Sequence, residues 1–152
     1  MGPWPPYCWP KMSRSPMFSA LGETGNYSGP VEAIALAPNG TLLAAGLGDN
    51  GLDLRDPSAG HAPRAYAYRV TKNPEALRFS PDGKWLAVVA PPESVDEDFR
   101  IGIFDASTGQ LRWEIRHVGS DAAMGQKVAM AFAPDGKTLY TAGRKLEAWA
   151  LK

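Results

Sequence analysis

A turn of proline, then asparagine or aspartate, then glycine occurs three times in this 152-residue chain. The turns begin at Pro38, Pro81 and Pro134, which lie 43 and 53 residues apart. Proline fixes φ at the first turn position, and Asn-Gly or Asp-Gly supplies the positive φ values with which a tight hairpin closes. Short apolar runs flank each turn, so we expect each turn to join two β-strands. The chain is therefore predicted to contain a repeated β unit.

The segments around the turns supply four strands to each complete unit. First strands end directly before the turns, in 34–37, 77–80 and 130–133, and second strands follow the turns. Third strands are predicted in 52–56, 101–105 and 146–150, and the clearest fourth strand is 111–116. Four antiparallel strands in about 40–45 residues are typical of a β-propeller blade. We predict an all-β propeller segment of about three four-stranded antiparallel blades, the last of them incomplete.

The same repeat pattern predicts where the N-terminal arm, the linker and the blades begin and end. The proline- and tryptophan-rich residues 1–15 are expected to form an unstructured arm. Residues 16–30 are expected to be either a linker or a clasp strand for the last blade, for which 16–28 are the candidate residues. The blades are expected at about 31–73, 74–126 and 127–152. In their first strands, alanines alternate with larger residues, as at 33–37 and 129–133, and small residues on one face suit strands at the crowded hub of a propeller.

Charge and composition exclude several classes of function. Lys and Arg together number 16, and Asp and Glu together also number 16, so the formal net charge is zero. The chain therefore lacks the net positive charge that would attract nucleic acid or an anionic membrane. Cys8 is the single cysteine and the chain has two histidines, which excludes an internal disulfide and a Cys/His zinc cluster. No apolar stretch near the N-terminus has the length of a secretory signal or a membrane span. A cytoplasmic protein without cofactors is the resulting prediction.

The second unit resembles a known repeat family. Residues 79–87, Phe-Ser-Pro-Asp-Gly-Lys-Trp-Leu-Ala, with Ile-Gly-Ile-Phe-Asp at 101–105 and Thr108-Gly109, resemble the blades of WD-repeat-like and YVTN-like propellers. The similarity extends over about residues 31–151. The Gly-His pair that precedes the first strand in that family is missing, and Phe104 or Arg55 stands where its tryptophan is usual.

The resemblance implies a non-catalytic protein-interaction or scaffold module rather than an enzyme. The alternative is an accessory or sensor propeller of a larger enzyme, such as a bacterial-type protein kinase or a hydrolase. Closed propellers have about four to eight blades, so three blades would leave two apolar faces and one strand edge exposed. Three arrangements remain open: a fragment of a longer propeller, two chains paired head to tail, or an open three-blade array.

One acidic cluster is the candidate partner-binding loop. Glu93, Asp96, Glu97 and Asp98 lie between the second and third strands of the second unit. Loops on a rigid scaffold often carry recognition, and these carboxylates would suit a basic protein partner. The alternative is that they are simply solvated.

Other polar and aromatic residues are expected to have structural roles. The sequence 136–138, Gly-Lys-Thr, looks like the end of a phosphate-binding loop but lies in a predicted hairpin turn. His61 and His117 are expected at the surface, and the alternating charges of 112–116 should keep an outer strand soluble. The tryptophans of the strands, Trp85, Trp113 and Trp149, are expected to be buried between blades.

Overall fold

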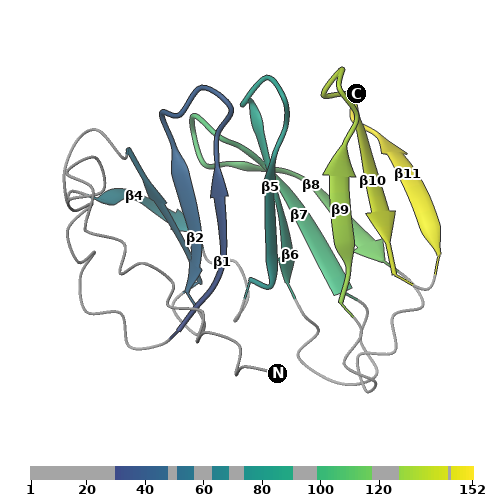
Figure 1. Ribbon diagram of the computed structural model, residues 1–152, viewed down its shortest axis with the longest axis horizontal. Helices are drawn as coiled ribbons and strands as arrows, with labels where there is room; N and C mark the ends of the chain where they lie inside the picture. Colours follow the sequence, from purple (N-terminus) through teal and green to yellow (C-terminus); the bar gives the residue numbers. More distant parts are fainter. Residues whose placement is uncertain are drawn as a thin grey trace, which may run out of the picture.

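The structure, a computed structural model, describes residues 30–47, 51–56, 63–68, 74–90, 99–117, 127–143 and 145–152. In these ranges the secondary structure consists of β-strands, which form three antiparallel sheets side by side (Figure 1). This confirms the predicted all-β propeller segment. The arm 1–15 and the candidate clasp 16–28 lie outside the described residues and stay predictions.

Each sheet is one blade, and its strands follow chain order. Blade 1 contains β1 (Val31–Leu36), β2 (Leu43–Leu47), β3 (Gly51–Arg55) and β4 (Pro63–Tyr68). Blade 2 contains β5 (Ala76–Phe79), β6 (Trp85–Ala90), β7 (Phe99–Asp105) and β8 (Leu111–His117). Blade 3 contains β9 (Ala129–Phe132), β10 (Thr138–Ala142) and β11 (Leu146–Ala150). The first strands β1, β5 and β9 are neighbours, as expected of inner strands at a hub.

The repeated turns close the hairpins in the same way in all three blades. The amide of Gly83 donates to the carbonyl oxygen of Ser80 at 2.9 Å, and equivalent bonds close the turns at Gly40 and Gly136. Positive φ values of 71°, 72° and 67° occur at the three glycines. The preceding residue contributes through its side chain, since Asp82 Oδ1 accepts hydrogen bonds from Ser80 Oγ at 2.6 Å and from the Lys84 amide at 3.1 Å. Glycine thus supplies the backbone conformation and the acidic or amide side chain locks it.

Blade 2 lies between the other two blades and shares a core with each. One face of its sheet packs on blade 1, and this core contains Ala44, Leu52, Leu54, Leu77, Leu86, Val88 and Phe104. The opposite face packs on blade 3, and this core contains Ala87, Val89, Phe99, Ile101, Ile103, Ile115, Val128, Met130 and Leu139. Strand alternation separates the two sets, since Ala87 and Val88 are adjacent in β6 and point to opposite faces. The continuous apolar character of β6 follows from burial on both faces.

In the inner strands, the residues on the two faces pack against different neighbouring blades. In β5, Leu77 packs toward blade 1, and in β9, Met130 packs toward blade 2. Ala33 and Ala35 in β1 pack in the opposite sense, toward blade 2. Large apolar residues of the inner strands therefore meet the preceding blade, and Ala33, Ala35 and Ala76 meet the following blade. The expected alternation at the hub is present, and the structure adds which neighbour each face contacts.

Candidate interaction surfaces

Blade 1 has a face that no described residue of another blade covers. Strand register brings Ile34, Ala45 and Asp53 into one row across the sheet, and Leu36, Leu43 and Arg55 into the next. We call these six residues the blade-1 open face. Ile34 is 65% exposed and Leu36 is 57% exposed. Large aliphatic side chains with this exposure, side by side on a flat sheet, are typical of a surface that another molecule or segment covers.

Comparison of equivalent positions in the three repeats shows which kind of contact the blade-1 open face resembles. Counted from the turn proline, Ile34 occupies the position of Leu77 and Met130, which are buried against the preceding blade. Leu36 likewise occupies the position of Phe79 and Phe132, which also pack into the cores between blades. The blade-1 open face is therefore the same kind of surface as the faces that form the two interfaces inside the chain.

Two charged residues distinguish the blade-1 open face. Arg55 takes the repeat position of Phe104, and its guanidinium forms an ion pair with Asp53. Both side chains are largely removed from water, with exposed fractions of 13% and 11%. Burial raises the pKa of Asp53, and a backbone hydrogen bond at Leu54 opposes this shift. The face thus combines an aliphatic inner part with a polar outer part.

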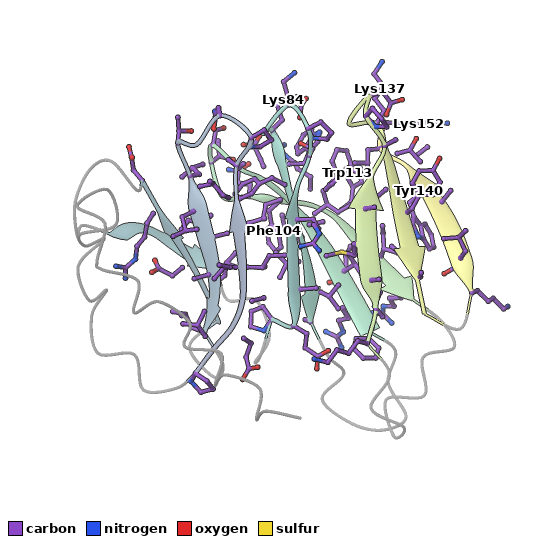
Figure 2. All side chains as sticks on the ribbon, in the orientation of Figure 1. Lys84, Phe104, Trp113, Lys137, Tyr140 and Lys152 are labelled. Atoms are coloured by element: carbon purple, nitrogen blue, oxygen red, sulfur yellow. The ribbon has the colours of Figure 1, made fainter. Side chains whose placement is uncertain are left out.

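Blade 3 has the second open face. Its inward face, with Met130, Leu139 and Trp149, contributes to the core shared with blade 2. Tyr140 and Leu146 lie on the outward face, where they are 43% and 75% exposed (Figure 2 labels Tyr140). Register places small residues around them. The blade-3 open face comprises Ala129, Ala131, Tyr140, Ala142, Leu146, Ala148 and Ala150.

A third surface is the end of the molecule where the three hairpin turns meet. A Cβ atom on Gly83 would lie 3.7 Å from Pro38 Cδ, and one on Gly136 would lie 3.6 Å from the Asp82 carboxyl carbon, so neighbouring turns touch. Lys84 and Lys137 extend from this end (Figure 2). Because its backbone is fixed by the turn hydrogen bonds, this end is a rigid polar surface.

The turn after β7 is held by hydrogen bonds to the side chain of Asp105. Asp105 Oδ1 accepts hydrogen bonds from the Ser107 hydroxyl at 2.6 Å and from the amides of Ser107 and Thr108, each at 3.0 Å. Arg112 Nη2 lies 3.5 Å from the other carboxylate oxygen. The hydrogen bond from Ser107 is the main reason that the pKa of Asp105 falls to about 2. This turn is the Asp-x-x-Thr-Gly segment, residues 105–109, on which the family resemblance partly rests.

The predicted partner-binding residues lie outside the part of the chain that the structure describes. Glu93, Asp96, Glu97 and Asp98 lie in 91–98, outside the described residues, between the buried ends of β6 and β7. His61 also falls outside them, and His117 is the last residue of β8. In the described part of the chain, no group of three His, Cys, Asp or Glu residues is placed to hold a metal ion. The candidate loop stays a prediction.

The structure also describes the predicted hairpin turn, the strand tryptophans and the charged outer strand. The segment 136–138 is a hairpin turn between β9 and β10, as expected. Trp85 and Trp113 pack edge to face, with ring centroids 4.9 Å apart, against the core between blades 2 and 3. Trp149 packs against the same core, and all three tryptophans are partly rather than fully buried. Arg112, Glu114 and Arg116 are exposed on β8.

Sequence reasoning predicted that two faces would be exposed but did not identify the residues of the blade-3 open face. Tyr140 and Leu146 are apolar residues in predicted strands, so the pattern alone gives them a core role. The informative comparison is between repeats, because Tyr140 occupies the position of Ala44 and Ala87, which are fully buried. A large aromatic residue at a position that is otherwise alanine indicates a different neighbour.

Antiparallel blades with shared cores and a common turn define this chain as a segment of a β-propeller. The chain is similar to two solved structures, described as the crystal structure of RRP9 WD40 repeats and the structure of U3-55K. Each has a TM-score of 0.65 and 18% sequence identity and covers 84% of this chain. These matches cover 37% and 38% of the two solved chains. The resemblance to WD-repeat propellers is thereby confirmed at the level of the fold.

Sequence relatives agree with this assignment. The chain is 29% identical over 128 residues to small ribosomal subunit protein RACK1 of Schizosaccharomyces pombe, and 25% identical over 118 residues to the protein of the same name from Neurospora crassa. The aligned parts are 82% and 75% of this chain but 38% and 34% of those relatives, so the chain spans little more than a third of their length. No family model matches the chain.

Proposed function

We propose that this chain acts as a non-catalytic protein-interaction module that presents loops and strand faces on a rigid stack of blades. The observation that carries this proposal is that blade 2 is packed on both faces, which fixes the ends of every strand from which its loops extend. A surface held on a packed blade loses less conformational entropy on binding than a flexible segment does. The similarity to WD-repeat proteins supports the same class of function.

The acidic loop is the proposed contact for a basic protein partner. Its flanking residues Ala90 and Phe99 are both buried, so the four carboxylates of 93–98 are carried between two fixed points. Four like charges in one short loop favour a partner segment rich in Lys or Arg, with binding that weakens as salt increases.

Affinity capture with the whole chain tests this proposal. The variant Glu93→Gln/Asp96→Asn/Glu97→Gln/Asp98→Asn should lose a basic protein that the wild type retains at low salt, with affinity falling by roughly 4- to 900-fold if each charge contributes about 0.2–1 kcal/mol. The matched control is Lys84→Gln/Lys137→Gln, which changes charges at the turn end of the strands and should retain the partner. Equal capture by the acidic-loop variant and the wild type would contradict the proposal.

Protein rather than nucleic acid is the proposed class of partner, and the cytoplasm is the proposed location. The balanced charge of the chain supports the first statement. Within the ranges that the structure describes, no helix is long and apolar enough to cross a membrane. Because the names of the relatives assign them to a ribosomal subunit, RNA binding requires a direct test. Filter binding of labelled single- and double-stranded RNA should show no retention at physiological salt, and salt-sensitive retention would contradict the proposal.

A further inference from the structure

We propose that Asn39, in the hairpin turn of blade 1, is a deamidation site whose reactivity is controlled by the hydroxyl group of Thr41. Asn39 is followed by Gly40, and both residues are exposed. Because glycine has no side chain, its amide nitrogen can approach the preceding asparagine more closely than that of a bulkier residue. The site lies at the turn end of the molecule, so the proposal depends neither on the acidic loop nor on its partner.

The reaction joins two groups that are neighbours in the chain. The Gly40 nitrogen attacks the side-chain carbonyl carbon of Asn39, Cγ, and the bond from Cγ to Nδ2 breaks. The proton of the Gly40 amide passes through solvent to Nδ2, which leaves as ammonia. Water then opens the resulting five-membered imide. Cleavage of its bond to Cγ gives aspartate, and cleavage of its bond to the main-chain carbonyl carbon gives isoaspartate.

The folded turn holds both reacting groups in place. The Thr41 hydroxyl donates a hydrogen bond to Asn39 Oδ1 at 2.8 Å, and the Thr41 amide donates to the same oxygen at 3.1 Å. The Gly40 amide donates to the carbonyl oxygen of Ala37 at 2.8 Å. Attack on Cγ requires rotation about the bonds of Asn39, and each of these hydrogen bonds opposes such rotation. The closed turn is therefore a protected state, and loss of the hydroxyl group should make it more reactive.

The turns of blades 2 and 3 show that aspartate is compatible with this position. Asp82 and Asp135 occupy the place of Asn39 in the repeat. Each accepts a hydrogen bond at Oδ1 from the amide two residues later, at 3.1 Å and 2.8 Å. Asn39 uses its own Oδ1 in the same way. Aspartate formed at residue 39 should therefore preserve the turn and add one negative charge to it.

Isoaspartate should not be compatible with the turn. It adds one carbon atom to the backbone after residue 39, whereas the hydrogen bond from the Gly40 amide to Ala37 requires a fixed chain length. The side chain of Asn39 also lies near the next turn, because its Nδ2 is 4.0 Å from the position of a Cβ atom on Gly83. An isoaspartate product should therefore open the blade 1 hairpin.

Peptide mapping by mass spectrometry, on the whole chain incubated at neutral pH, tests the proposal. Conversion at Asn39 should be about fivefold faster in Thr41→Val than in the wild type, the factor that corresponds to one hydrogen bond of ~1 kcal/mol. Thr41→Ser retains the hydroxyl group and should react at the wild-type rate. Conversion of Asn39 at the same rate in Thr41→Val and the wild type, or no conversion in either, overturns the proposal.

Two other asparagines supply internal controls. Asn50, outside the described residues, also precedes a glycine, and its conversion should not change when Thr41 is substituted. Faster conversion at both sites would show that general unfolding controls the reaction, and the proposal would fail. Asn73 precedes Pro74, which has no amide hydrogen, so it should remain an amide. In urea, where the turn is absent, wild type and Thr41→Val should convert Asn39 equally fast, and a difference there would contradict control by the folded turn.

The two products are compared by urea unfolding. Asn39→Asp reproduces the aspartate product and should have the same unfolding midpoint as the wild type, whereas aged protein enriched in isoaspartate at residue 39 should unfold at a lower urea concentration. A lower midpoint for Asn39→Asp would overturn the equivalence with Asp82 and Asp135 on which the tolerated product depends.

Discussion

At the scale of the residue, blade 3 replaces an apolar pair of blade 2 with a hydrogen-bonded one. Trp149 and Thr141 occupy the repeat positions of Phe104 and Val88, and the indole Nε1 donates to the threonine hydroxyl at 3.0 Å. Thr141 is fully buried. A buried hydroxyl is tolerated here because the tryptophan on the neighbouring strand brings a donor to it.

This pair predicts a measurable coupling. Thr141→Val should reduce the free energy of unfolding by about 1 kcal/mol because the indole N–H loses its acceptor. The double variant Thr141→Val/Trp149→Phe reproduces the blade 2 pair and should regain part of that loss, giving a coupling of about 1 kcal/mol in urea unfolding. The reverse control Val88→Thr introduces a hydroxyl beside Phe104 and should destabilise the protein. Additivity of the two single changes would show that the hydrogen bond contributes nothing.

Asp105 predicts a pH dependence. Its pKa is lowered to about 2, so its carboxylate contributes its full stabilisation above the unfolded-state value of about 3.9 and loses it as the pH falls toward 2. Wild-type stability should therefore fall more steeply between pH 5 and pH 2.5 than that of Asp105→Asn, which should cost about 1 kcal/mol at pH 7. The control is Asp135→Asn, where the described hydrogen bond is a single one from the Lys137 amide. Parallel pH profiles for wild type and Asp105→Asn would contradict the assignment.

At the scale of the element, the junction between blades depends on close approach of backbone to backbone. A Cβ atom on Gly46 in β2 would lie 2.7 Å from the carbonyl oxygen of Pro74, which precedes β5 and has a fully buried side chain. Since a backbone carbonyl cannot move aside as a flexible side chain can, any larger residue would push the two blades apart.

Gly46→Ala should therefore be more destabilising than Gly40→Ala. The first change overfills an interface and should cost about 2–3 kcal/mol. The second affects a turn glycine with φ of 71° and nothing within 4 Å of the new Cβ, so it should cost only about 1 kcal/mol of backbone strain. Thermal and urea unfolding of the two variants measure the difference, and equal losses would show that the contact with Pro74 is not limiting.

The hairpin elements were predictable from the sequence because their causes are local. The Pro-x-Gly turns, the three strands around each of them and the strand at 111–116 depend on turn chemistry and alternation, and they appear where expected. The pattern could not predict which neighbouring blade each face of a strand contacts. Ala33 and Ile34 alternate in the same way whichever neighbour they meet, and only the packing of β5 on β1 decides it.

At the scale of the whole molecule, the sequence predicted an incomplete ring with exposed apolar faces, and the structure identifies the residues involved. Ile34 and Leu36 could be anticipated from their equivalence to Leu77 and Phe79. Tyr140 could not, because a tyrosine in a strand is compatible with a core and with a surface. The acidic loop at 93–98 was singled out by charge alone, and charge does not determine how a loop is held, so it stays a prediction.

Equivalent positions in different blades should respond differently to the same change. Leu77→Ala removes a fully buried side chain from the core between blades 1 and 2 and should cost about 2–5 kcal/mol at any protein concentration. Because blade 2 also holds blade 3, the loss should appear in one cooperative transition. Ile34→Ala removes a side chain that is 65% exposed in the single chain, so dilute protein should change by no more than about 0.5 kcal/mol.

Protein concentration separates the two variants further. If two chains pair head to tail and bury Ile34 between them, the cost of Ile34→Ala should grow as the concentration rises into the range where that dimer is populated, since association stabilises only the folded state. The cost of Leu77→Ala should remain constant over the same range, because its neighbours belong to the same chain. Unfolding midpoints measured over a hundredfold range of concentration decide the matter: a cost for Ile34→Ala that does not change with concentration would place that side chain outside any contact between copies.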